Sequence, residues 1–432
     1  MEEVAGFAFF PPPPRSIKDT GLNLGLLLDL TLKTLYLEGF MTGAQIANAL
    51  ALPYAGVMDK VLELMRREHL CEVRGSKTVS EHAFEYTLTD KGTEKAKEAL
   101  ERSQYVGPAP VPLEEYRKAM KAQPLSATAI TPESLRKALA HLVLGEDILR
   151  QLGPAVIMGH SLFIYGPPGN GKTAISEAIG KLISQHSIFI PYAVEVNGHI
   201  IKVYDNLNHK LVVQGAEAVI QYDRRWLLAH RPFIAVGGEL TLENLDLIYN
   251  EITRYYEAPI QMKANGGMLL IDDFGRQQAR PQDILNRWIV PLEKRVDYLT
   301  LHTGLKIEIP FEVFVVFSTN LPPARLVDEA FLRRIRHKVE VRNPTFDEYR
   351  LIFRKECEAK GIPYDENALV YLLREHYIKQ KVPLRACHPR DILDQLVSIA
   401  RYTKRQPRLT KELIDEAWAA YYLSIQKQEK SS

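Results

Sequence analysis

Eight consecutive residues, Gly-Pro-Pro-Gly-Asn-Gly-Lys-Thr at 166–173, have the spacing G-x-x-x-x-G-K-T of a phosphate-binding loop. An apolar run at 162–165 predicts a strand before them, and residues 174–184 predict a helix after them. The glycines let backbone N–H groups close around a β-phosphate, and the helix N-terminus adds a partial positive charge. We expect the phosphates to be bound by Gly166, Pro167, Pro168, Gly169, Asn170, Gly171, Lys172 and Thr173.

Two acidic residues follow a second apolar run. Residues 268–271 predict a buried strand, which ends at Asp272 and Asp273 next to the phosphate-binding loop. We expect the Thr173 hydroxyl to bind Mg²⁺ directly and Asp272 to orient the ion through water. Asp273 stands where a base for an attacking water is needed. The pattern thus predicts a nucleotide site with a catalytic carboxylate.

Three further segments carry polar residues toward this site. A third apolar run, 313–317, ends near Asn320, which we expect to contact the γ-phosphate or the attacking water. Arg333 and Arg334 lie between a predicted helix and a strand, where they can act on the nucleotide of a neighbouring subunit. Arg390 begins a helix with Pro389 and can reach the phosphates from a C-terminal domain. For these arginines an ordinary surface position is the alternative.

The five elements in this order resemble the AAA+ ATPase superfamily, whose motifs are Walker A, Walker B, sensor 1, arginine finger and sensor 2. The likeness spans residues 126–425 and is greatest to the branch with a β-hairpin ahead of sensor 1, which includes bacterial enhancer-binding activators and MoxR-type chaperones. Residues 264–273 are similar to the activators' Walker B region, and residues 298–309 alternate around a Thr-Gly turn as that hairpin requires. The resemblance implies ATP as substrate, Mg²⁺ and a hexameric ring.

The chain departs from these relatives in several ways. Asp273 stands where the superfamily usually has Glu, which predicts slower turnover. The activators' sigma-contacting loop is absent, and the pore loop of protein-unfolding relatives is not evident. We therefore expect an ATPase that remodels a protein partner in a chaperone-like way. The alternatives are a DNA-binding ATPase or transcription regulator, and a nucleotide-gated scaffold that hardly hydrolyses ATP.

The elements before the nucleotide core predict two smaller regions. Residues 1–20 contain four consecutive prolines and are expected to form a flexible arm. Residues 21–103 predict three helices, two strands and a final helix, and they resemble a winged helix that binds DNA or docks on a protein. Residues 104–125, rich in proline, are expected to be an extended linker.

The rest of the chain is predicted to contain alternating strands and helices, followed by a run of helices. We expect an α/β nucleotide-binding core at 126–343, with a parallel sheet flanked by helices, and a helical lid at 344–432. The segment 185–265 is long and predicts a strand pair, 192–197 with 200–204, and then an amphipathic helix. This segment is either a partner-contacting insertion or a structural embellishment.

Composition limits the class of protein. The 432 residues are 46% hydrophobic and 25% charged, which excludes general disorder. No apolar run reaches the roughly 18 residues of a membrane helix, and the start lacks the pattern of a signal peptide. Residues 1–105 carry 12 Lys and Arg against 15 Asp and Glu, which argues against strong binding of a phosphate backbone there. Three widely separated cysteines fit a reducing cytoplasm. We therefore expect a cytoplasmic protein without membrane insertion.

Overall fold

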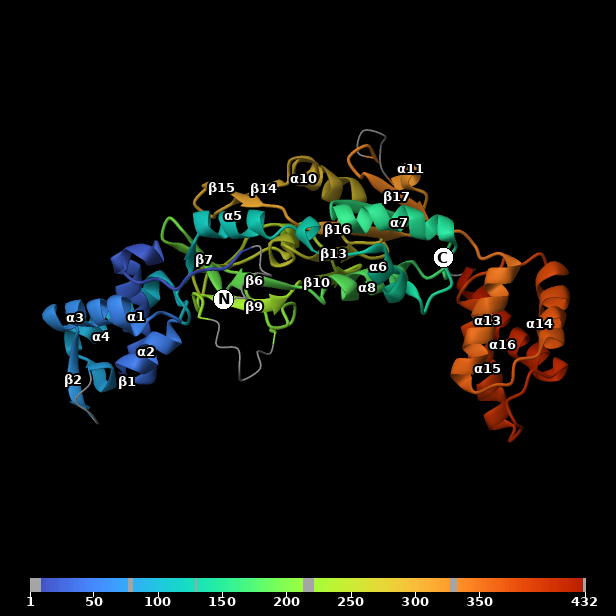
Figure 1. Cartoon of the computed structure of the whole chain (residues 1–432), viewed down its shortest axis with the longest axis horizontal. Coiled ribbons are helices and arrows are strands. Elements are labelled where there is room, and N and C mark those ends of the chain that lie inside the picture. The colour runs from blue at the N-terminus through green and yellow to red at the C-terminus, as the bar shows by residue number, and fades with distance from the viewer. Residues whose placement is uncertain (1–8, 77–80, 129, 213–220, 327–331, 430–432) are drawn as a thin grey trace.

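The computed structural model describes residues 9–76, 81–128, 130–212, 221–326 and 332–429. A central sheet lies between N-terminal helices at one end of the long axis and C-terminal helices at the other (Figure 1). Five separate hydrophobic clusters stabilise these parts. The molecule is therefore built from several hydrophobic cores.

The central sheet has five parallel strands in the order β10-β13-β16-β5-β17. Their bounds are β5 Ser161–Tyr165, β10 Phe233–Val236, β13 Met268–Ile271, β16 Phe314–Thr319 and β17 His337–Glu340. Apolar side chains fill both faces, so these strands read as continuous hydrophobic runs. Since the strands are parallel, their carboxyl ends meet at one edge, where a ligand site is expected.

Helices cover both faces of this sheet, so the α/β fold with a parallel sheet and flanking helices is as predicted. One face packs against α6 (Pro132–Leu139), α7 (Glu146–Met158) and α8 (Lys172–Ile183). The other face packs against α9 (Ile260–Lys263) and α10 (Pro281–Lys294), where Trp288 is fully buried.

A second sheet is formed mainly by the long segment between α8 and β13. It has five strands in the order β11-β12-β8-β7-β4, and a separate antiparallel pair joins β6 and β9. The bounds are β4 Val111–Pro112, β6 Ser187–Pro191, β7 Ala193–Val196, β8 His199–Lys202, β9 Trp226–His230, β11 Ile248–Asn250 and β12 Tyr255–Glu257. The predicted strand pair is present as β7 and β8, which are antiparallel. The predicted amphipathic helix is wrong: only the short η6 (Glu243–Leu245) forms, and the chain then turns through Arg254 at φ +55° between β11 and β12.

A β-hairpin precedes the strand β16. Its strands β14 (Val296–Thr300) and β15 (Lys306–Pro310) are antiparallel, and Gly304 adopts φ +84° in the turn as a Thr-Gly turn requires. Leu299, Ile307 and Ile309 join the hydrophobic cluster of the second sheet. The hairpin therefore connects the second sheet to β16, the strand that Asn320 directly follows.

The N-terminal region is a small helical unit with a three-stranded sheet of order β1-β3-β2. Its elements are η2 Lys18–Thr20, α1 Leu24–Glu38, β1 Phe40–Thr42, α2 Gly43–Ala49, η3 Tyr54–Met58, α3 Asp59–Arg67, β2 Cys71–Ser76, η4 Glu81–Ala83, β3 Phe84–Leu88 and α4 Asp90–Arg102. Thr42 caps α2 with a capping box, and Thr89 caps α4. The helices and strands expected at 21–103 thus form in the expected order.

The C-terminal region is helical, as predicted. Its elements are α13 Phe346–Lys360, α14 Glu366–Leu372, η7 Leu373–Ile378, α15 His388–Tyr402 and α16 Lys411–Glu429. Thr345 forms a capping box with Glu348, and Pro389 lies in the first turn of α15. The four helices enclose their own hydrophobic cluster.

The flexible arm predicted at 1–20 is wrong from residue 9 onward; residues 1–8 lie outside the described part. Phe9 packs edge-on against Trp226, and Phe10 packs against Phe189. The carbonyl of Pro11 accepts a hydrogen bond from the Asp223 N–H at 2.9 Å. Burial of two aromatic rings offsets the entropy of ordering this segment, an effect that the proline run alone does not reveal.

The linker predicted at 104–125 is also wrong. Val111–Pro112 is the edge strand β4, which pairs with β7, and α5 (Leu113–Ala122) buries Tyr116 and Met120. A short η5 (Leu125–Ala127) follows. Pro112 lies in this edge strand, where a missing N–H is tolerated. This segment is therefore part of the folded core.

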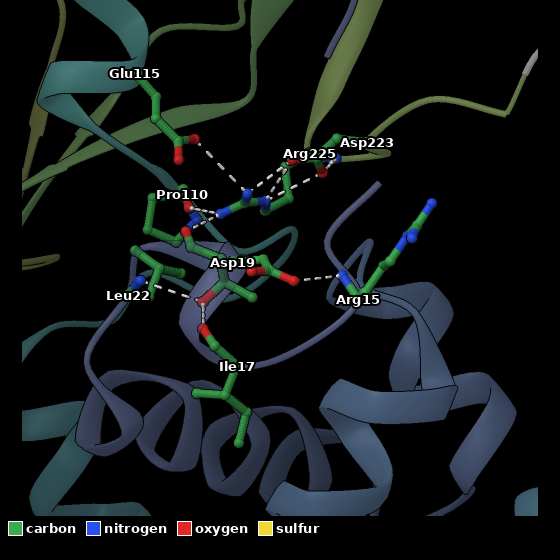
Figure 2. Close-up of polar contacts among 9 residues, drawn as sticks. Arg15, Ile17, Asp19, Leu22, Pro110, Glu115, Asp223 and Arg225 are labelled. Carbon is green, nitrogen blue, oxygen red and sulfur yellow. Dashed lines mark hydrogen bonds and ion pairs between the residues drawn. The ribbon is translucent and has the colours of Figure 1, made fainter. Parts of the chain in front are cut away.

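Arg225 joins these two segments to the start of β9 (Figure 2). Its guanidinium is 1% exposed and pairs with Asp223 at 2.7 Å. It also donates to the carbonyls of Thr20 at 2.7 Å and Pro110 at 3.3 Å. Glu115 lies 3.8 Å away. We name Arg225, Asp223 and the carbonyls of Thr20 and Pro110 the Arg225 joint.

Within the described ranges, no helix has both the length and the apolar character needed to cross a membrane.

Candidate functional site

A cavity of about 460 Å³ lies at the carboxyl edge of the central sheet. It is lined by residues of the phosphate-binding loop, the ends of β13 and β16, the approach to α7, and the C-terminal helices. The predicted site residues among its lining are Pro168, Gly169, Asn170, Gly171, Lys172, Thr173, Asp272, Asp273, Asn320 and Arg390. The structure therefore brings four of the five predicted elements to one cavity.

The phosphate-binding loop turns tightly between β5 and α8. Gly166 has φ +142°, and a Cβ there would lie 2.3 Å from the Val341 carbonyl, so only glycine fits beside the extension of β17. Gly171 precedes α8, and no side chain caps this helix. The first N–H groups of α8 are thus available to an anion, with the favourable end of the helix dipole.

Lys172 is 6% exposed and holds the loop closed. Its ammonium donates to the carbonyls of Gly166 and Pro167, both at 2.9 Å, and to Asn320 Oδ1 at 2.7 Å. An ammonium has three donors, so all three are in use. Burial lowers the pKa of Lys172, and the charges of Asp273 and Asp272 partly oppose this effect. A nucleotide phosphate would replace neutral acceptors with an anion and favour the charged form.

The two acids at the end of β13 occupy different surroundings. Asp272 Oδ2 accepts a hydrogen bond from the Thr173 hydroxyl at 2.8 Å. Asp273 has φ +47°, an uncommon conformation for a residue with a Cβ, and its carboxylate lies 3.3 Å from Asn320 Nδ2. Gln277 donates to the carbonyls of both acids, which stabilises the turn. Asp273 is therefore aimed across the cavity at the residue that also contacts Lys172.

The C-terminal helices close one side of the cavity. Ile352, Lys355 and Glu356 from α13 lie there, together with Arg390 from α15. Arg390 Nε donates to Asp391 at 3.1 Å, and this hydrogen bond and charge raise the pKa of the arginine. The arginine therefore stays a full cation beside the phosphate-binding loop.

An apolar end of the cavity lies before α7. Leu142, Val143 and Leu144 line it, next to His141. Ile352 of α13 also lines the cavity. This end offers a flat organic ring the apolar surface that the phosphate end lacks.

Arg333 and Arg334 lie elsewhere. They line a separate cavity of about 330 Å³ with Leu292, Glu293 and Arg336, and Arg334 is 3.5 Å from Glu293. Part of the helix predicted before them falls on residues 327–331, outside the described part. Their separation from the phosphate-binding loop of the same chain is what a role on a neighbouring subunit requires.

Several residues of the cavity were not predicted from the sequence. Cys387 lies against the phosphate-binding loop, Gln277 stabilises the acidic turn, and Lys355 and Glu356 come from α13. Among these residues, the sequence pointed to the cavity only for Cys387, which directly precedes the His-Pro-Arg segment with the predicted Arg390. The others depend on how distant helices pack against the sheet.

Comparisons with known proteins bear on the fold. A family model described as a domain of unknown function, DUF8689, matches residues 345–420, which form most of the C-terminal helical region. No curated protein matches the chain.

Solved structures of two proteins are similar. The RuvB Holliday junction branch migration motor of Thermotoga maritima is 13% identical over 70% of this chain and 72% of its own, with a TM-score of 0.36. NtrX of Brucella abortus in complex with ADP is 15% identical over 75% of this chain and 65% of its own, with a TM-score of 0.38. NtrX with ATP is 13% identical over 75% and 62%, with a TM-score of 0.36.

The fold class is defined by this chain's own geometry. A five-stranded parallel sheet carries the phosphate-binding loop after β5 and two acids after β13, and a helical region adjoins the site. This is an α/β fold of the P-loop type, with a parallel sheet flanked by helices and a C-terminal helical region.

Proposed function

We propose that this chain is a ring-forming AAA+ ATPase of the cytoplasm, which binds and hydrolyses ATP to remodel a protein partner. The observation that supports this best is the convergence of Lys172, Thr173, Asp272, Asp273, Asn320 and Arg390 on one cavity. A triphosphate fits beside the uncapped start of α8, and the adenine ring fits the apolar end at Leu142–Leu144.

The donor set suits Mg²⁺. The Thr173 hydroxyl and the Asp272 carboxylate are hard oxygen ligands 2.8 Å apart, the type of ligand that Mg²⁺ prefers. Bound there, the ion would neutralise charge on the β- and γ-phosphates. Asp273, held by its turn and by Asn320, is placed to accept a proton from the attacking water. A phosphate that enters must displace Lys172 from at least one of its three acceptors, which ties loop rearrangement to binding.

Arg333 and Arg334 would complete the site of the adjoining subunit. Guanidinium groups stabilise the charge that spreads over the γ-phosphate in the transition state. A closed ring places each chain's arginines at its neighbour's nucleotide, and the hexamer follows the family resemblance. The division into a core at 126–343 and a lid at 344–432 belongs to the same proposal.

The test is phosphate release by the purified protein and its variants. Arg333→Ala with Arg334→Ala should lower turnover by about a thousandfold, the size of an arginine-finger effect, while ATP binding remains. Normal hydrolysis by this variant would contradict the action on a neighbouring subunit.

Rapid turnover by the wild type would exclude a nucleotide-gated scaffold. Asp273→Glu should restore the family's usual carboxylate and raise the rate of phosphate release.

The N-terminal region fits a winged helix that docks on a protein. Helices α1, α2 and α3 and the sheet β1-β3-β2 follow the order of that fold, with α3 in the place of a recognition helix. The exposed face of α3 alternates in charge, since Lys60 pairs with Glu63 and Arg67 lies 3.9 Å from Glu68. A face with neutralised cations is poorly suited to a DNA backbone.

A DNA-binding ATPase or regulator is the second candidate. It is favoured by Lys60, Arg66 and Arg67, three cations against the two acids Asp59 and Glu63 in the lining of a cavity of about 650 Å³ at α3. A gel-shift assay at low and at high salt separates the two candidates. Binding to duplex DNA that weakens steeply with salt supports the second, and no binding at low salt excludes it.

A further inference from the structure

Asn170, inside the phosphate-binding loop, is 4% exposed and uses both ends of its side-chain amide. Its Nδ2 donates to Asn343 Oδ1 at 2.8 Å, and its Oδ1 accepts from the Ala386 N–H at 3.1 Å. Neither partner belongs to the loop. One side chain therefore links the phosphate-binding loop to two distant points of the chain.

Both partners flank the C-terminal helical region. Asn343 lies between β17, which ends at Glu340, and α13, which begins at Phe346. Ala386 lies two residues before α15, whose first turn carries Arg390. Asn170 thus contacts the entry to the helical region and the segment that places the predicted sensor arginine.

A backbone contact next to Asn170 strengthens the same link. The Cys387 N–H donates to the Gly169 carbonyl at 2.8 Å. Gly169 has φ +80°, and a Cβ there would lie 2.5 Å from Cys387 Sγ, so the loop and the segment before α15 are in direct contact. Consecutive loop residues, 169 and 170, therefore hold consecutive residues of the lid, 387 and 386.

We propose that Asn170 is a positioning residue, which couples the conformation of the phosphate-binding loop to the placement of the lid and of Arg390. This inference rests on the proposed ATPase function and deepens it. When a triphosphate rearranges the loop around Lys172, Asn170 carries the change to Asn343 and Ala386. The lid then approaches or leaves the phosphates as one body with Arg390.

The chain offers a matched pair of variants at the partner residue. Asn343→Ala removes the acceptor of Asn170 Nδ2, whereas Asn343→Asp replaces the amide oxygen with a carboxylate oxygen, which also accepts a hydrogen bond. Turnover should fall about fivefold in Asn343→Ala and stay within about twofold of the wild type in Asn343→Asp, while the Kd of ATP changes less than about threefold. Asn170→Ala should lower turnover about tenfold, because it loses both hydrogen bonds.

Two readouts separate positioning from a merely structural role. In the double variant Asn170→Ala with Asn343→Ala, turnover should equal that of Asn170→Ala alone. Asn170→Ala already removes the hydrogen bond to Asn343, so the second substitution has no further bond to remove. Hydrogen exchange at residues 385–391 should be faster in Asn170→Ala than in the wild type, with and without ATP, because the Ala386 N–H has lost its acceptor.

The outcomes are distinct. Multiplying effects of the two substitutions, or equal losses in Asn343→Ala and Asn343→Asp, would overturn the inference, and so would unchanged exchange at 385–391. A wild type that neither binds nor hydrolyses ATP contradicts the proposed function instead. The exchange measurement without nucleotide still tests the contact in that case.

Discussion

Two nearly buried cations, Lys172 and Arg225, occupy different regions and are satisfied in different ways. Arg225, 1% exposed, holds a buried carboxylate, Asp223, at 2.7 Å and adds two backbone carbonyls (Figure 2). Lys172, 6% exposed, has only neutral acceptors within hydrogen-bond distance, and burial lowers its pKa. The first cation is paired within the fold. The second lies beside an open cavity, where an anion could replace its neutral acceptors.

The difference separates a structural joint from a ligand site. A buried ion pair is stabilised by both partners and strongly destabilised when one is removed. A buried cation that contacts carbonyls and an amide gains most when an anion arrives. The Arg225 joint should therefore matter for stability, whereas Lys172 should matter for nucleotide binding.

Of the effects that test this comparison, the largest is expected on turnover at Lys172. Lys172→Ala should lower phosphate release by at least about a hundredfold, since it removes a charge aimed at the phosphates. The melting temperature should change little, because the lost bonds go to neutral groups. A fall in stability as large as the fall in activity would contradict the comparison.

The next effect is on stability at the Arg225 joint. Arg225→Ala should lower the free energy of unfolding by about 3 kcal/mol, because Asp223, 3% exposed, is left buried without its partner. Urea titrations measure this change. The double variant Arg225→Ala with Asp223→Ala should be less destabilised than the single one, and Kd for ATP should stay near the wild-type value in both.

The smallest effect concerns His388 at the start of α15. Burial, with a smaller contribution from the charge of Arg385, lowers the pKa of this histidine from 6.5 to about 4. The unfolded chain therefore binds the proton first, and stability falls as the pH drops through 6.5 toward 4. We expect a loss of about 2 kcal/mol between pH 6.5 and 4.5 from this group.

His388→Asn is the matched variant, since its side-chain oxygen can take the place of Nδ1, which lies 2.9 Å from the Tyr377 hydroxyl. Denaturant titrations at several pH values should give a flatter pH dependence for this variant. An unchanged slope would show that His388 does not titrate in this way.

The nucleotide core could be predicted because its signals are local. The phosphate-binding loop, the acids after β13 and the strand before Asn320 are each encoded by adjacent residues. Parallel strands then bring their carboxyl ends together without further information. The helical C-terminal region was predicted for the same reason, since helices are local elements and Pro389 marks the start of one of them.

The arm and the linker were predicted wrongly because their order depends on distant partners. Phe9 packs on Trp226, 217 residues away in sequence, and Phe10 packs on Phe189, 179 residues away. Val111 pairs with Val194, which is 83 residues away. Proline content describes the local backbone alone, and nothing in a single sequence indicates which apolar surface will cover it. The same limit hid the contact between Asn170 and Ala386.

Calorimetric titration of ATP with Mg²⁺ into the purified wild-type chain and into Lys172→Ala tests the central claim most directly. We predict saturable binding to the wild type and its loss in the variant, while both remain folded. An absence of binding to the folded wild type, or equal binding to both proteins, would contradict the claim that this cavity holds a nucleotide.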